Sequence, residues 1–157
     1  MNKKLILSIS FLYFLPNQCN EISKGKLAVT QIIRVQTKNA PEASGPYSQA
    51  IKVIDAHEIL FISGQLPIIP ETGVLVTEPP EATKQCLRNL AAILKEAGMD
   101  FRNVVETIIL LKNIADFPVV NEAYKSFLQE PYPARATFQA GALPKDATVE
   151  IKMTAVR

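Results

Sequence analysis

PARATFQAGALPKDATVEI, residues 133–151, has the pattern of two β-strands joined by a turn. Two β-rich runs flank a turn that contains Gly141 and Pro144, a pattern typical of two strands joined by a tight connection. Arg135 opens the first run and Glu150 lies near the end of the second. A mostly apolar pair of strands therefore carries two opposite charges, which are the first candidates for a functional role.

Four further strands are predicted upstream. The run TQIIRVQT (30–37) alternates as a strand does, and the runs QAIKVI (49–54) and EILFISGQL (58–66) flank Asp55, Ala56 and His57 as in a hairpin. Lone His57 is expected to be an exposed turn residue. The run VVETIILLKNI (104–114) is apolar enough for a strand buried on both faces.

Two helices are predicted between these strands. In residues 81–99, Leu87, Leu90 and Leu94 recur at helical spacing and Gly98 follows as a stop signal. Residues 116–130 predict a second helix, capped by Asp116 with Pro118 in its first turn. The order β-β-β-α-β-α-β-β predicts a two-layer α+β domain, in which a mixed six-stranded sheet carries both helices on one face.

The other face of this sheet needs a cover. Residues 108–111 are apolar in both alternation classes, and two helices can cover only one face. We expect a homo-oligomer that buries the second face between subunits. The alternative is a monomer whose leader or long loop covers the sheet.

Composition limits the possible partners. A chain of 157 residues with 48% hydrophobic and 20% charged residues is typical of one globular domain. Residues 1–28 hold four of the 17 basic and one of the 15 acidic residues, which leaves 13 basic and 14 acidic side chains and a net charge of −1. This balance argues against nucleic acid as a partner. Cys19 and Cys86 are expected to be free thiols, without the neighbouring ligands that a metal site requires.

The first 28 residues are predicted to be a leader, either signal-like or disordered, and residues 29–157 the folded domain. Lysines precede an apolar stretch from Leu5 to Leu15, which is the layout of a secretory signal but is too short to span a bilayer. We expect a cytoplasmic protein whose folded domain has no membrane partner. Export is the alternative, if residues 1–20 act as a signal peptide.

The residue types suggest a site, although each candidate also has a simpler explanation. The planar guanidinium of Arg135 is suited to holding a carboxylate by two parallel hydrogen bonds, and Glu150 could carry a proton. Equally, Arg135 could be an edge-strand residue in water, and Glu150 part of a polar strand face. The motifs SGPYSQ, with Tyr47, and ISGQLP, with Ser63 and Gly64, could each be only a turn.

The sequence resembles the RidA (YjgF-type) family of reactive enamine and imine deaminases. The resemblance rests on residues 133–151 together with NAPEASGPYSQAI (39–51), FISGQLP (61–67) and VVNEAY (119–124), and it runs from about Ile32 to Arg157. It implies a chorismate-mutase-like fold that forms a homotrimer, with active clefts between subunits. This implication agrees with the uncovered sheet face.

The resemblance also implies an activity: hydrolysis of 2-iminobutanoate, 2-iminopropanoate and their enamine tautomers to 2-oxo acids and ammonia, without metal or cofactor. Arg135 would grip the substrate carboxylate and Glu150 would activate water. The remaining substrate-binding positions would be Tyr47, Ser63, Gly64, Asn121 and Thr137. Thr137 departs from the cysteine that many members carry there, so no thiol role can be transferred to it.

A different class of function remains open, namely a non-catalytic trimer of the same fold that binds small carboxylates or acts like a chaperone. Glu150 argues against it, because a second carboxylate beside a bound anion would weaken binding. Ribonuclease activity is disfavoured by the net charge of −1 and by the lack of a paired histidine.

Overall fold

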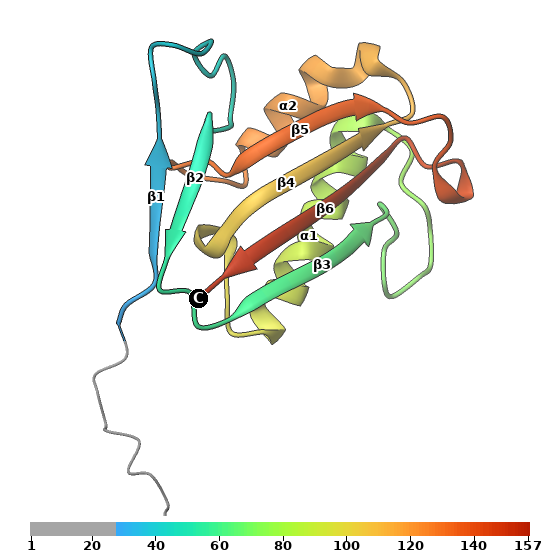
Figure 1. The fold of residues 1–157 in the computed structure, drawn as a ribbon. Coiled ribbons are helices and arrows are strands. Elements are labelled where there is room, and N and C mark those ends of the chain that lie inside the picture. Colours follow the sequence, from blue (N-terminus) through green and yellow to red (C-terminus); the bar gives the residue numbers. More distant parts are fainter. Residues whose placement is uncertain (1–27) are drawn as a thin grey trace, which may run out of the picture.

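The computed structural model describes residues 28–157 (Figure 1). The leader predicted at residues 1–28, including Cys19, lies outside this range except for its last residue, so the division of the chain remains a prediction. Within residues 28–157, no helix has the length and apolar character needed to cross a bilayer. The elements are β1 (Gln31–Val35), β2 (Ala50–Ile54), β3 (Ile59–Gln65), α1 (Pro79–Glu96), η1 (Phe101–Asn103), β4 (Val104–Leu111), η2 (Ile114–Asp116), α2 (Phe117–Lys125), β5 (Ala134–Gln139), η3 (Pro144–Asp146) and β6 (Val149–Val156).

The strands form two sheets. The larger has the order β3-β6-β4-β5, in which β4 and β5 run parallel and the other neighbours run antiparallel. The smaller consists of β1 and β2. The predicted α+β class with six strands, mixed pairing and two helices is confirmed, and the six strands are divided between two sheets.

The predicted hairpin around His57 is wrong. β2 pairs with β1 and not with β3. The turn between β2 and β3 therefore leads the chain from the smaller sheet into the larger one. The backbone N–H groups of His57 and Glu58 both donate to the carbonyl of Arg157, so the end of β6 holds β3 and takes the place that β2 was expected to occupy. His57 itself is exposed, as predicted.

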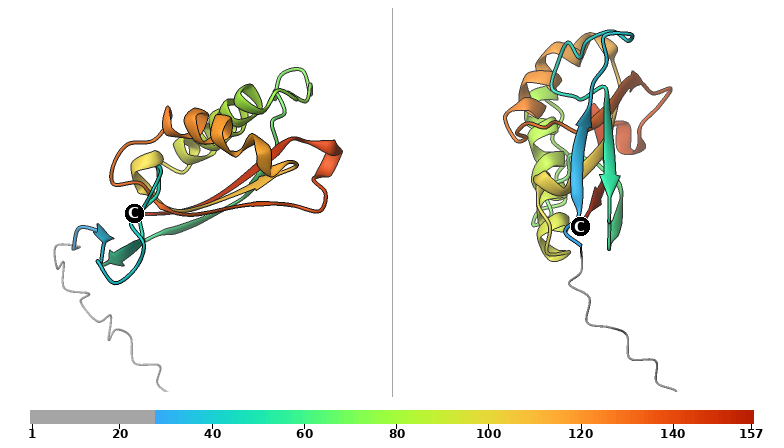
Figure 2. Two further views of the ribbon diagram at one scale, coloured as in Figure 1. Left: turned by 90° about the horizontal axis from the view of Figure 1, so that it is seen from above. Right: turned by 60° about the vertical axis from the view of Figure 1, so that its left-hand side comes forward.

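Both helices pack on one face of the larger sheet (Figure 2). Leu87, Leu90 and Leu94 of α1 are fully buried, and they pack in one core with alternate residues of the strands, such as Ile109 and Ile151. α1 starts at Pro79, earlier than predicted, because proline is tolerated in a first turn that needs no N–H. It ends before Gly98, whose φ of +68° is the left-handed conformation that favours glycine.

The second helix is shorter than predicted and is capped differently. Pro118 lies in its first turn, as expected, but the side chain of Asp116 makes no capping hydrogen bond. A 3-10 turn, η2, precedes the helix, and the side chain of Asn113 accepts from the N–H of Ala115 at 3.1 Å. The capping hydrogen bond has thus moved to the start of η2.

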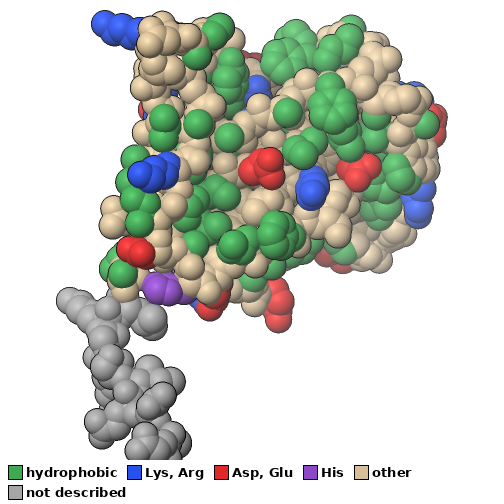
Figure 3. All heavy atoms as spheres, viewed as in Figure 1, with side chains coloured by type: hydrophobic (Ala, Val, Ile, Leu, Met, Phe, Trp, Pro, Cys, Tyr) green, Lys and Arg blue, Asp and Glu red, His purple; other side chains and the backbone are tan. Residues whose placement is uncertain are grey.

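The opposite face of the larger sheet is uncovered in the protomer. Phe61 is 74% exposed, Ile59 58% and Phe138 48%. Figure 3 shows apolar side chains spread over this side of the molecule, with single charged groups among them. The predicted bare sheet face is therefore present.

Candidate active site

Arg135 lies at the start of β5 within a group of aromatic rings. Its guanidinium carbon is 5.0 Å from the ring centre of Tyr124, 5.5 Å from that of Tyr47 and 5.9 Å from that of Phe117. Its Nη2 donates to Oδ1 of Asn121 at 2.8 Å. The ring faces attract the cation, and the hydrogen bond fixes the orientation of the guanidinium plane.

Helix α2 supplies most of this environment. Phe117, Asn121 and Tyr124 are spaced four and three residues apart, which places them on one face of a helix. The hydroxyl of Tyr124 donates to Oγ1 of Thr107 at 3.0 Å and so fastens α2 to β4. Phe117 and Tyr124 were missed as site residues from the sequence, although this spacing was visible there.

The guanidinium has capacity for a further partner. Among the described residues, Nη1 of Arg135 is buried without a hydrogen-bond partner, and so is Oγ1 of Thr137, two residues along the strand on the same face. Burial lowers the pKa of Arg135, while nearby Tyr124 and Tyr47 act in the opposite direction. Arginine stays charged despite such shifts, so the site presents a fixed positive charge with an unused donor.

Tyr47 reaches Arg135 from the connection between β1 and β2, residues 36–49. Its hydroxyl accepts from the N–H of Ser44 at 3.2 Å and lies 3.3 Å from the hydroxyl of Ser44. These side-chain and backbone bonds, with a smaller effect of the Arg135 charge, lower the pKa of Tyr47. The SGPYSQ motif is therefore a turn that places the ring of Tyr47 beside Arg135.

A second group of predicted residues gathers around Glu150 in β6. The register between β3 and β6 shifts between Ile62 and Gln65, which marks an irregularity at Ser63 and Gly64. A Cβ placed on Gly64 would lie 1.8 Å from Oε1 of Glu150, so only glycine leaves room for the carboxylate in this position. Ser63, next to it, is exposed.

The two groups lie on opposite faces of the sheet. Paired residues share a face and successive residues alternate. Arg135 pairs with Thr107 and Glu150 pairs with Leu110, both in β4. Because Thr107 and Leu110 are an odd number of positions apart, Arg135 and Thr137 face the helices, and Glu150 faces the open side. One protomer therefore does not bring all the predicted residues together.

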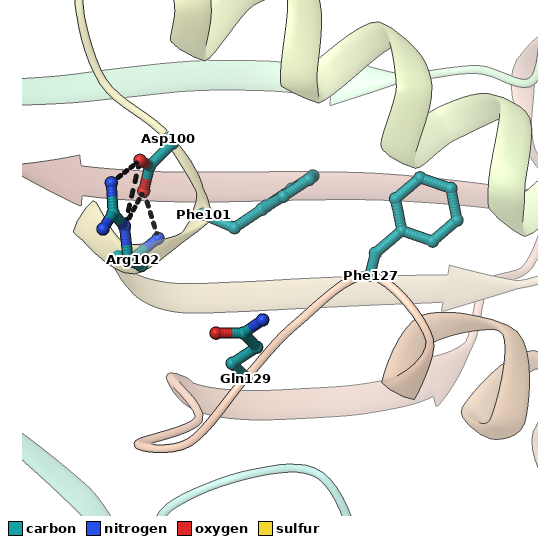
Figure 4. Close-up of a pocket in the computed structure, with 5 residues that line it drawn as sticks. All are labelled: Asp100, Phe101, Arg102, Phe127 and Gln129. Carbon is teal, nitrogen blue, oxygen red and sulfur yellow. Dashed lines mark hydrogen bonds and ion pairs between the residues drawn. The ribbon is translucent and has the colours of Figure 1, made fainter.

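Of two cavities on the protomer surface, one lies next to the predicted site residues and the other does not. One of about 290 Å³ borders Gly45 and Asn121 beside Arg135. Another of about 330 Å³ lies between η1 and the segment after α2, where Phe101 and Phe127 meet edge to face (Figure 4). Asp100 and Arg102 in this second cavity already pair with each other, and it contains no predicted site residue.

Cys86 is a free, buried thiol, and burial together with the charge of Glu150 raises its pKa to about 12. In the part of the chain that the structure describes, no group of three or more His, Cys, Asp or Glu side chains is placed to hold a metal ion.

The fold and the site together define the class of protein. It is an α+β domain with two helices on one face of a mixed sheet, and its candidate anion-binding site is an arginine on the edge strand β5, surrounded by aromatic rings. Comparison with known proteins then gives the family. Residues 37–157 match the family described as Endoribonuclease L-PSP, and the chain belongs to this family.

Its relatives include named deaminases. The chain is 49% identical over 122 residues to the chloroplastic Reactive Intermediate Deaminase A of Arabidopsis thaliana, covering 77% of this chain and 64% of that protein, less than two thirds of its length. It is 47% identical to the mouse 2-iminobutanoate/2-iminopropanoate deaminase, covering 82% of this chain and 96% of that one. The crystal structure of Escherichia coli TdcF with bound serine superposes with a TM-score of 0.62 at 34% identity, covering 80% of this chain and 98% of that one. The RidA-family resemblance is thereby confirmed, and so is the expectation that the protein is an enzyme of the deaminase class.

Proposed function

We propose that this protein hydrolyses reactive 2-imino acids and their enamine tautomers, with 2-iminobutanoate and 2-iminopropanoate as substrates, to 2-oxo acids and ammonia. The observation that carries the proposal is the guanidinium of Arg135, held by Asn121 and three aromatic rings, with Nη1 left without a partner among the described residues. A cytoplasmic location is part of the proposal.

The substrate carboxylate would bind to Arg135. A guanidinium forms two parallel hydrogen bonds with a carboxylate, and a 2-imino acid carries that group next to its C=N carbon. Tyr47, Asn121 and Thr137 surround the arginine and would line this side of the cleft. The solved relative TdcF holds serine, an amino acid of comparable size, which is consistent with a small site.

Glu150 would perform the proton transfers. It accepts a proton from water as the water oxygen bonds to C2 of the iminium, giving a tetrahedral carbinolamine. It then returns this proton to the amine nitrogen. The C–N bond breaks and ammonia leaves as the carbinolamine hydroxyl gives its proton to Glu150 and the C2 carbonyl forms, and Glu150 finally releases this proton to solvent. An iminium is already electrophilic, so orientation and a proton carrier meet the chemical need. Gly64 leaves space for the carboxylate, and Ser63 would line the cleft beside it.

A homotrimer would complete the site. Arg135 and Glu150 face opposite sides of the sheet, so a small substrate held by both requires residues from two protomers. The apolar face with Phe61 and Phe138 supplies a surface for that contact. We expect light scattering in solution to give the mass of three chains. A stable monomer mass would rule out this interface and with it the shared cleft.

The activity is tested in a coupled assay. A threonine dehydratase releases the imine, and formation of 2-oxobutanoate is followed in the presence of an amine that traps imines. We expect this protein to accelerate 2-oxobutanoate formation and to reduce the trapped product in parallel. The heat-denatured protein is the control.

Equal rates with native and denatured protein would contradict the proposal. Binding of 2-oxobutanoate by calorimetry without any acceleration would instead support the non-catalytic carboxylate-binding alternative.

A further inference from the structure

We infer that Gln49 is a positioning residue, which closes the segment 36–49 and thereby holds Tyr47 against Arg135. The inference deepens the proposed function, because it rests on Arg135 as the group that binds the substrate carboxylate. No role for Gln49 follows from its residue type alone; its hydrogen bonds indicate one.

The segment 36–49 has no helix or strand of its own. A connection of this length is usually functional, and it needs hydrogen bonds beyond those of secondary structure to keep one conformation. Gln49 provides them. Its Oε1 accepts from the N–H of Thr37 at 2.7 Å, and its Nε2 donates to the carbonyls of Thr37, Ala40 and Pro41 at 3.1, 3.2 and 2.7 Å.

The residue before Gln49 is fastened to the main sheet. The N–H of Ser48 donates to the carbonyl of Pro133 at 3.0 Å, and its hydroxyl donates to the carbonyl of Tyr132. Gln49 therefore joins the first half of the segment to this fixed point. Only residues 42–47 remain to span the gap, and a shorter closed span has fewer conformations to lose.

That remaining span carries the groups that meet Arg135. Tyr47 lies 5.5 Å from the guanidinium carbon, and a Cβ placed on Gly45 would lie 3.7 Å from both Nη2 of Arg135 and Oδ1 of Asn121. Among the residues that the structure describes, the hydroxyl of Tyr47 bonds only within the span, to Ser44. The position of the ring thus depends on how the span is closed, which is what Gln49 determines.

The first measurement is amide hydrogen exchange of peptides covering residues 36–49. The variant Gln49→Met keeps the side-chain length and removes every side-chain hydrogen bond of Gln49. The variant Gln49→Glu keeps the side-chain shape but removes the N–H donors. Both variants are expected to accelerate amide exchange in residues 42–48 by about tenfold, because the span opens more easily without the hydrogen bonds that close it. Gln31→Met, an exposed change on β1 of the same two-stranded sheet, is the matched control and should leave exchange unchanged.

The second measurement is a double-mutant cycle with Tyr47. Gln49→Met is expected to raise KM for the imine by about tenfold with little change in kcat, since it disturbs the arginine side of the cleft and leaves Glu150 in place. In the Tyr47→Leu background the same change should have less than about a twofold effect, because Gln49 acts through Tyr47. A residue that only stabilised the fold would give additive effects.

The outcomes separate this inference from the proposed function. Unchanged exchange in both Gln49 variants, or additive kinetics in the cycle, overturns the positioning role while leaving the activity intact. If the wild-type protein proves inactive, the proposed function fails, and modification of Arg135 by phenylglyoxal, followed by mass spectrometry, replaces the kinetics. Faster modification in Gln49→Met than in Gln31→Met then supports the positioning role, and equal rates overturn it.

Discussion

Replacing Arg135 with lysine is expected to reduce kcat/KM for the imine by roughly thirty-fold to nearly a thousand-fold, equivalent to about 2–4 kcal/mol. Lysine keeps the charge but loses the planar pair of donors that matches a carboxylate. It also loses the guanidinium bond to Asn121 and the contact of the guanidinium with the ring of Tyr124. Charge alone should not restore turnover. The coupled assay measures the effect.

The control for this prediction is Arg34→Lys on β1. Arg34 is exposed and makes one loose contact to Glu130 at 3.8 Å, so the same chemical change there should leave activity and stability unaltered. Circular dichroism and light scattering are needed to check that each variant keeps its fold and assembly. If Arg135→Lys deaminates at nearly the normal rate with assembly intact, Arg135 has only a structural role among the aromatic rings and the site assignment is wrong.

The parts of the fold that could be predicted are those that short segments determine. The leucines of α1 recur at helical spacing because one side of that helix is buried, and Leu87, Leu90 and Leu94 are indeed fully buried. β4 is apolar on both faces: the helices cover one of them, and the other belongs to the uncovered side of the sheet. In both cases the pattern of apolar residues can be recognised within one continuous segment.

Strand pairing could not be predicted in the same way. β2 and β3 are close in sequence and have hairpin-like spacing, yet β6, from the far end of the chain, lies between β3 and β4. Such a choice depends on the free energy of long-range packing, about which a local pattern carries no information. The failed cap at Asp116 has a more local cause, since the turn η2 begins earlier and uses Asn113.

In the candidate site, too, short motifs could be recognised in the sequence but their arrangement in space could not. Motifs pointed to Arg135, Glu150 and Gly64, but their distribution over two sheet faces follows from the register of β5 and β6 on β4. This register emerges only when the sheet is assembled. Phe117 and Tyr124 were missed for a different reason, because aromatic residues on a helix are usually interpreted as core. Tyr124 is fully buried, and its ring nevertheless forms part of the arginine site.

The chemical step should fail when Glu150 is replaced with glutamine. A neutral amide can hold water but cannot take its proton, so kcat is expected to fall by about 10²–10⁴-fold, the usual contribution of a general base. Affinity for the unreactive product 2-oxobutanoate should be kept or slightly improved, because a negative charge near the bound carboxylate is removed. Stopped-time product assays and calorimetry measure the two quantities separately.

Gly64→Ala tests whether the position of that carboxylate matters as well as its presence. The new Cβ would lie 1.8 Å from Oε1 and 2.7 Å from Cδ of Glu150, so the side chain has to turn away while its charge and the sheet remain. We therefore expect kcat to fall towards the level of Glu150→Gln, with product affinity preserved. Gly141→Ala is the matched control, because a Cβ placed there meets no heavy atom within 4 Å. Full activity in Gly64→Ala, with the fold unchanged by circular dichroism, would show that the carboxylate of Glu150 does not act from the place where Gly64 holds it, and the proton-transfer role would have to be given up.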